Sequence, residues 1–285
     1  MEMLITLAIS GVAIVAVGAL SFRQQRFHRD IVAATERLEQ LDQATALVPI
    51  ALRSIAPGEG DIPAGGARDT SLEFRATIAT AVVCDSGHGS LVLAPTHTDP
   101  PRLASILARP DVGDTAWSLT MAGAVEAWVP RAIVGVSDST VSCLVGGKSP
   151  WSGPAARPSL VLRVATASAD EGQFVRITRA WRYSIYRSSD GDWYLGAREW
   201  NAGNLRFNTI QPVSGPFVSA TAHGLEFRYF DSTGIAVTSG ASNTREIALI
   251  QVAFRVDSAL PGKFSHAISV KGSSTTSIAL RNRPQ

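Results

Sequence analysis

An uncharged apolar run near the N-terminus constrains this chain more than any other feature. Between Met3 and Leu20 there is no charged residue, and the only polar side chains are Thr6 and Ser10. A helix of this length is roughly 27 Å long, close to the ~30 Å hydrocarbon core of a bilayer. We therefore expect a membrane span whose lipid-facing side chains are Met3, Leu4, Ile5, Leu7, Ile9, Val12, Ile14, Val15, Val17 and Leu20.

The apolar run continues without a break signal into an amphipathic stretch. From Phe27 to Ile55, apolar residues recur at steps of three and four, the spacing of one helix face. Such a face must pack on another part of the protein, and we expect its seam to comprise Ile31, Leu38, Leu41, Val48, Leu52 and Ile55. Pro49 lies inside this pattern, and a proline in a helix interior costs about 3 kcal/mol, so we expect a kink or break near Thr45.

Two features of this N-terminus leave alternatives open. The small residues from Ala16 to Ala19 could be the cleavage site of a secretory signal peptide, although the apolar run is long and continuous with the next helix. Arg23, Arg26, His28 and Arg29 lie just after the run, and basic residues on that side favour a cytoplasmic location for the rest of the chain. The cysteines favour export instead, so the sequence leaves the orientation undecided.

The totals of the chain fit one or two domains. A chain of 285 residues with 45% hydrophobic residues can bury a substantial core. The net charge is only +2 and the basic residues are scattered, which argues against a nucleic-acid partner. We divide the chain into a transmembrane half-helix (1–22), an amphipathic half-helix (23–56), a Pro/Gly-rich linker (57–69) and a β-rich head domain (70–285).

From Thr70 onward the hydrophobic period changes from that of a helix to that of strands. Asp190-Gly191 predicts a hairpin turn, because this dipeptide tolerates the positive φ that such turns require. A short helix is expected around 102–108. The strands are expected at 71–83, 90–93, 124–136, 140–145, 159–165, 173–187, 193–200, 225–230, 247–256 and 276–280. The expected fold class is α+β, with a long N-terminal helix, transmembrane and then amphipathic, packed on a mainly antiparallel β-sheet domain.

No motif in the chain carries catalytic chemistry. The five histidines lack metal-ligand spacing, and 85–88 places Asp, Ser and His too close in sequence for a catalytic triad. Gly146 to Ser149 lacks the spacing of a phosphate-binding loop. Asp190 and Asp192 could bind calcium, but a hairpin turn is the better interpretation. We expect no enzyme activity, no cofactor, no metal site and no small-molecule substrate.

The order of motifs resembles the type IV pilin superfamily, in particular its long minor pilins and the minor pseudopilins of type II secretion. Glu2 and the apolar run from Met3 to Leu7 match the start of the family's mature chain. Near the other end, 224–234, 245–255 and 277–283 follow the order of strand motifs in long minor pilin-like proteins. The family's basic leader and its final Gly are absent, which favours a true translation start upstream of Met1. Residues 100–220 have no counterpart in the resemblance.

The resemblance implies a function in assembly. The chain would be a single-pass inner-membrane subunit with an extracytoplasmic head, which primes or caps a type IV pilus or a type II secretion pseudopilus. Its partners would be other pilin or pseudopilin subunits and the lipid bilayer. In the family, the carboxylate at the position of Glu2 pairs with the N-terminal amine of a neighbouring subunit. The alternative is that Glu2 lies in water at the start of the helix, where its negative charge interacts favourably with the helix dipole.

A second class of function remains open from the sequence. The chain could be a solitary membrane-anchored, extracytoplasmic β-domain that binds a ligand or an envelope partner.

The two cysteines, Cys84 and Cys143, both come after the apolar run and lie in strand-like segments. An even pair in an exported domain is more often bridged than free. We therefore expect a disulfide between them, provided that the head is exported.

Overall fold

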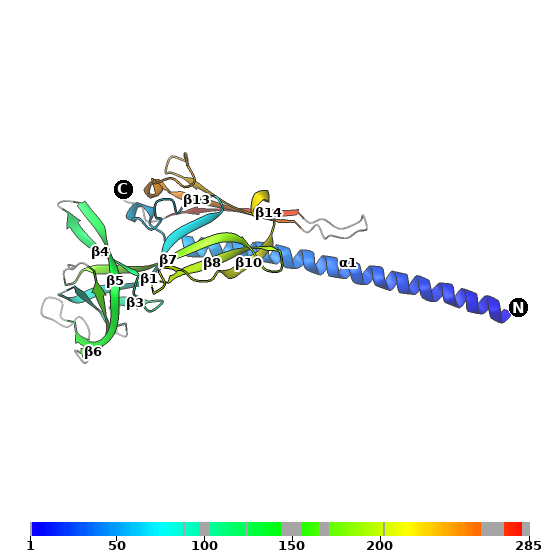
Figure 1. Cartoon of the computed structure of the whole chain (residues 1–285), viewed down its shortest axis with the longest axis horizontal. Coiled ribbons are helices and arrows are strands. Elements are labelled where there is room, and N and C mark those ends of the chain that lie inside the picture. Colours follow the sequence, from blue (N-terminus) through cyan, green and yellow to red (C-terminus); the bar gives the residue numbers. More distant parts are fainter. Residues whose placement is uncertain are drawn as a thin grey trace.

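The computed structural model describes residues 2–87, 89–96, 103–122, 125–143, 156–165, 171–201, 203–257 and 271–280. Within α1, the side chains of residues 2, 4–10, 12, 13 and 30 lie outside the description. Figure 1 shows one long helix that projects from a β-rich head, with the N-terminus at the free end of the helix.

The helix α1 runs from Glu2 to Leu52 and is continuous through Pro49. The expected break near Thr45 is therefore wrong. Pro49 lacks the N–H that would bond to the carbonyl of Thr45, so the helix loses one bond there, but the Pro49 carbonyl still accepts a bond from Arg53 N at 3.0 Å. The neighbouring Val48 and Leu52 are completely buried, so packing on the head stabilises this last turn.

Two antiparallel sheets surround the C-terminal end of α1. One side is formed by β10, β8, β7 and the first part of β1, and the other is a four-stranded sheet in the order β12-β11-β13-β14. Helix α1 contacts β10, β13 and β14. The bounds of these strands are β1 Ser71–Gly87, β7 Phe174–Arg187, β8 Trp193–Asn201, β10 Gln211–Phe217, β11 Leu225–Phe230, β12 Ala236–Val237, β13 Leu249–Asp257 and β14 Lys271–Ala279.

Beyond the end of the helix, the sheet closes on itself as a small barrel. Successive pairings join β7, β4, β5, β6, β2 and β1, and β1 pairs again with β7. The register of β1 against β7 shifts between Thr77 and Ala79, where the strands pass from the helix-bound sheet into the barrel. The remaining strands are β2 Ser90–Leu93, β3 Ala104–Ile106, β4 Thr115–Ala122, β5 Val125–Ser142, β6 Ala156–Val164 and β9 Arg206–Phe207.

The head therefore has two hydrophobic cores. The first packs the end of α1 between the two sheets, with Leu52, Phe74, Phe227 and Phe254 among its fully buried side chains. The second fills the barrel with aliphatic residues, including Val83, Leu91, Ile133, Leu162, Val175 and Ile177. In the described part of the chain, three short 3-10 helices lie in connections: Pro57–Glu59 (η1), Ala220–Ala222 (η2) and Thr244–Glu246 (η3).

The predicted fold class is wrong as stated and needs correction. The molecule is mostly β, with a single N-terminal helix packed on antiparallel sheets, which agrees with α+β only in the broad sense. The difference arises in the head, where the described residues after Leu52 form strands and short 3-10 turns but no further α-helix. Among the described residues, no helix has the length and apolar character needed to cross a membrane.

Several local predictions also change. The short helix expected around 102–108 is wrong, because Ala104–Ile106 forms β3 and pairs with β1. The two strands expected at 124–136 and 140–145 lie largely in one long strand, β5. The expected linker 57–69 packs tightly, since Asp61 and Ile62 are buried.

Candidate assembly helix

The part of α1 outside the head exposes large apolar side chains. Met3 is 88% exposed, Ile14 73% and Phe22 69%, and Val15, Val17 and Leu20 are exposed to a similar degree. Exposed apolar surface of this extent is typical of an interaction site rather than of a free helix in water. We call the segment from Glu2 to Glu36 the free arm of α1.

Hydrogen bonds at Arg37 and Gln40 join α1 to the head. The guanidinium of Arg37 donates to the carbonyl of Asp257 at 2.6 Å, and the Ser214 hydroxyl donates to the carbonyl of Gln40 at 2.6 Å. Gly272 in β14 faces Leu38 and Leu41, and a side chain at this position would collide with Val256 and press against Leu38. These contacts fix where the free arm leaves the head.

The residues of the predicted seam divide at this boundary. Leu41, Val48, Leu52 and Ile55 are buried in the core around the helix. Ile31 is 42% exposed and Leu38 is 40% exposed. The same apolar stripe thus continues beyond the head, and its outer part has no cover within the described residues.

Several predicted site residues are described by their backbone alone. The side chains of Glu2, Leu4, Ile5, Leu7, Ile9 and Val12 lie outside the described residues, although the backbone of these positions is helical. Glu2 therefore sits at the start of α1, and its proposed partner stays a prediction.

A buried ionic cluster, which we call the neck, fixes the end of α1 to the barrel. The Arg176 guanidinium donates to both carboxylate oxygens of Asp61, at 2.8 and 3.0 Å, and forms an ion pair with Glu59 at 2.8 Å. Asp61 is fully buried, and its carboxylate also accepts a bond from the backbone N–H of Ala56, just after the helix. Burial raises the pKa of the Asp61 carboxyl, and the positive charge of Arg176 opposes that shift.

Aromatic rings enclose the same guanidinium. Arg176 lies 5.5 Å from the ring centroid of Trp117 and 5.7 Å from that of Trp128, within the range of cation–π attraction. The indole N–H of Trp117 donates to the Thr178 hydroxyl at 2.8 Å. The sequence did not reveal this cluster, because Asp61 and Arg176 are 115 residues apart and the members follow no motif.

A second ionic group lies on the same strand. Arg179 in β7 pairs with Asp114 at 2.8 Å and with Glu199 at 2.7 Å, and hydrogen bonding to Asp114 raises the pKa of its guanidinium. Since β7 belongs to both the barrel and the helix-bound sheet, Arg176 and Arg179 together connect the two parts of the head.

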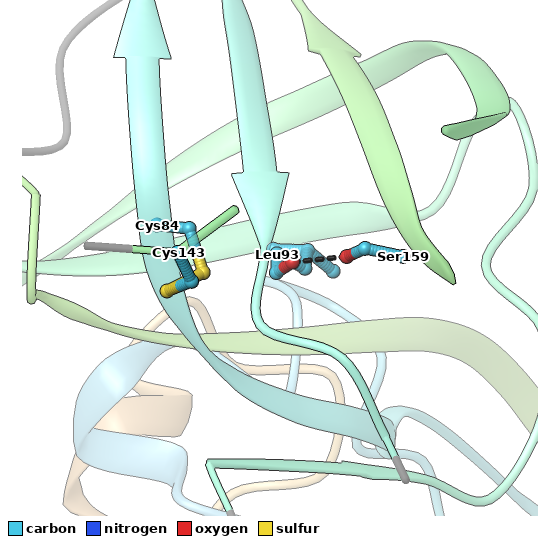
Figure 2. Close-up of a disulfide and its surroundings, with 4 residues drawn as sticks. All are labelled: Cys84, Leu93, Cys143 and Ser159. Carbon is cyan, nitrogen blue, oxygen red and sulfur yellow. Dashed lines mark hydrogen bonds between the residues drawn. A yellow bond between two sulfur atoms is a disulfide. The ribbon is translucent and has the colours of Figure 1, made fainter. Parts of the chain in front are cut away.

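The predicted disulfide between Cys84 and Cys143 is present, and their Cα atoms are 4.7 Å apart. Cys84 lies where β1 leaves β7 to pair with β2, and Cys143 comes directly after β5 (Figure 2). Close by, the Ser159 hydroxyl of β6 donates to the carbonyl of Leu93 at the end of β2 (Figure 2). The disulfide thus joins β1 to the segment that follows β5.

The remaining candidates for chemistry have structural surroundings. Asp190 accepts hydrogen bonds from the Asp192 N–H and the Tyr194 hydroxyl, both at 2.9 Å, which lowers the pKa of its carboxyl and fits the predicted hairpin turn. His88 and the loop 146–149 lie outside the described residues. Among those described, no group of His, Cys, Asp or Glu side chains could hold a metal ion.

Comparisons with protein-family models, with curated proteins and with solved structures found no match.

Proposed function

We propose that this chain is a minor pilin-like or pseudopilin-like subunit that assembles with other subunits through the free arm of α1. The observation that carries the proposal is the free arm itself: a helix with exposed apolar side chains on a head that is well packed. A helix of this kind gains stability only when other apolar surface covers it. Neighbouring helices of the same kind would supply that surface.

The shape of the molecule supports a role in which the barrel stays accessible after assembly. The barrel lies at the end of the molecule opposite the N-terminus of α1 (Figure 1). In an assembly held together by its helices, the barrel would remain accessible at the outside or the tip. The neck makes the barrel continuous with the base of α1, so that the position of the helix determines the position of the barrel.

The disulfide supports a location outside the cytoplasm for the head. Bridged cysteines persist mainly in oxidising compartments. Priming or capping of an extracytoplasmic filament is compatible with this chemistry.

Photo-crosslinking in the full chain tests the proposal. A photoreactive residue in place of Val15 should link the protein to a second subunit with a similar N-terminal helix, identified by mass spectrometry. Thr233 is exposed in the turn after β11 and serves as the matched control on the head. If Val15 and Thr233 give the same products, or if Val15 links to lipid alone, the alternative of a solitary binding domain is favoured.

A further inference from the structure

Among the described strands, none pairs with the outer edge of β14, and this edge lacks the usual protection against pairing. The strand forms the end of the four-stranded sheet and pairs with β13 over its whole length without a register shift. It contains no proline, and its one charged residue is Lys271 at its start. Proteins commonly shorten an exposed edge or interrupt it with bulges, prolines or charges, because a long regular edge readily adds another strand.

The other strands that end the two sheets do carry such protection. β12 has 2 residues and β3 has 3. β10 contains Pro212 and Pro216, and its register shifts twice against β8. Among the described strands, β14 is the one long and regular edge.

Two hydrogen bonds show which backbone groups of β14 point outward. Arg255 N donates to Gly224 O on the β11 side of β13, and Leu280 N donates to Ala248 O at the end of β14. The backbone groups of successive residues point to opposite sides of a strand, so the neighbours of Arg255 in β13 bond to β14 instead of β11. Their partners in β14 belong to the alternating set 272, 274, 276 and 278. The N–H and C=O groups that point to the open edge are those of Lys271, Ser273, Thr275, Ser277 and Ala279.

The side chains of those same five residues are exposed, whereas Gly272 and Ile278 face α1 or the core. Within the described part of the chain, none of the hydroxyls from Ser273 to Ser277 has a hydrogen bond. With respect to the described residues, the edge therefore offers both unpaired backbone groups and unpaired hydroxyls.

We propose that β14 binds the β14 strand of a second copy of the chain, antiparallel, about a two-fold axis at Thr275. In this register, Lys271 lies opposite Ala279, Ser273 opposite Ser277, and Thr275 opposite its own copy. Every outward-pointing residue then meets another one, so that each pair exchanges two backbone hydrogen bonds. Ser and Thr pairs across the strands add to the stability, and no like charges face each other.

The resulting interface is isologous, and it joins two four-stranded sheets into one continuous sheet. β14 runs beside α1 (Figure 1), and its Gly272 faces Leu38 and Leu41 of the helix. The two-fold axis reverses the strand and with it the helix, so the two free arms point in opposite directions. This pairing is therefore a separate contact that does not rest on the proposed packing of helices.

Cysteine crosslinking in the full-length protein tests the register. The native cysteines are joined to each other, so an added cysteine is the one available thiol. Under mild oxidation, Thr275→Cys should give a covalent homodimer, because hydrogen-bonded residues on antiparallel strands lie about 5.5 Å apart, within the span of a disulfide. A mixture of Ser273→Cys and Ser277→Cys chains should link to each other, whereas each variant alone should link at least tenfold less.

Further variants separate this contact from other ways of associating. Thr275→Pro, added to both chains of the mixture, removes an outward N–H and leaves the bonds to β13 in place, so it should abolish the link. Thr275→Val keeps the N–H and should preserve it, and Glu2→Ala should also preserve it. The proposal is overturned if Thr233→Cys dimerises equally, if Ser273→Cys links to itself as readily as to Ser277→Cys, if the link survives Thr275→Pro, or if Thr275→Cys captures a different protein instead of its own copy.

Discussion

At the residue scale, the neck depends on one cation. Arg176 is the positive charge that pairs with both Asp61 and Glu59, and only 8% of its side chain is exposed. Removing one member of a buried ion pair is costly, because the remaining charge loses its partner and has no water to replace it. The two carboxylates would be left in that position.

We therefore expect Arg176→Met to lower the free energy of unfolding by about 3–5 kcal/mol at neutral pH. Denaturant unfolding measures this. Arg109→Met is the matched control, since Arg109 pairs with Asp138 at 2.8 Å on the exposed surface, and it should leave the stability nearly unchanged. A similar stability for both variants would contradict the importance of burial at the neck.

The pH dependence of the Arg176→Met variant gives a second test. Burial raises the pKa of Asp61 and of Glu59, and Arg176 opposes both shifts, so the variant should have carboxyl pKa values that are raised further. A carboxyl with a raised pKa in the folded state adds stability below its unfolded pKa and loses that contribution as the pH rises through the folded pKa. The difference in unfolding free energy from the wild type should therefore be smaller at pH 4.5 than at pH 7.5, with both measured under the same denaturant; a constant difference would contradict this expectation.

At the scale of single elements, the two parts of α1 contribute differently to folding. The large apolar side chains of the free arm, such as Ile14 and Phe22, are mostly exposed, whereas Leu41 and Val48 fill the core. Deleting residues 1–29 should leave a folded, soluble, monomeric head. Deleting residues 1–47 should instead open the core, because Leu41 and Ala44 are lost. Circular dichroism and gel filtration distinguish the two outcomes, and a molten or aggregated product from the shorter deletion would show that the free arm is needed for the fold.

The disulfide belongs to the same scale, because it joins β1 to the end of β5. Its cysteines are 59 residues apart in sequence. In the chain-entropy model, closing a loop of this length stabilises the folded state by roughly 4 kcal/mol. Reduction should therefore lower the melting temperature of the wild type, whereas a Cys84→Ala/Cys143→Ala double variant should not respond to the reductant. An unchanged melting temperature of the reduced wild type would show that barrel packing alone maintains the fold.

The elements that were predictable are those with strong local signals. The period of apolar residues located the buried part of the seam, and Asp190-Gly191 located the β7–β8 hairpin. β4 and β10 were missed: β4 is a mixed sequence with few β-branched residues, and β10 contains two prolines that argue against a strand. The barrel and the neck were not predictable, since they depend on which distant strands pair, and no short-range pattern specifies that.

At the scale of the whole molecule, the proposed assembly requires a specific interaction that sets the axial register between neighbouring helices. Apolar side chains alone pack with little preference for one axial position, and the free arm is apolar over most of its length. A single carboxylate at the start of that arm would fix the position, because a charge among apolar helices is costly unless it finds a partner. Glu2 is the one acidic residue before Asp30.

We expect Glu2→Ala to reduce incorporation into filaments by about tenfold or more, since losing one partner of a buried charge pair costs about 2 kcal/mol or more. The measurement is the fraction of the chain that is recovered with pelleted filaments from cells, relative to total protein. Glu36→Ala is the control, because Glu36 is an exposed acid on the same helix, close to the head. The head should keep its melting temperature in both variants, which separates loss of assembly from loss of folding. If Glu2→Ala is recovered with filaments as fully as Glu36→Ala, then shape and apolar contact alone set the register, and the carboxylate only favours the helix dipole.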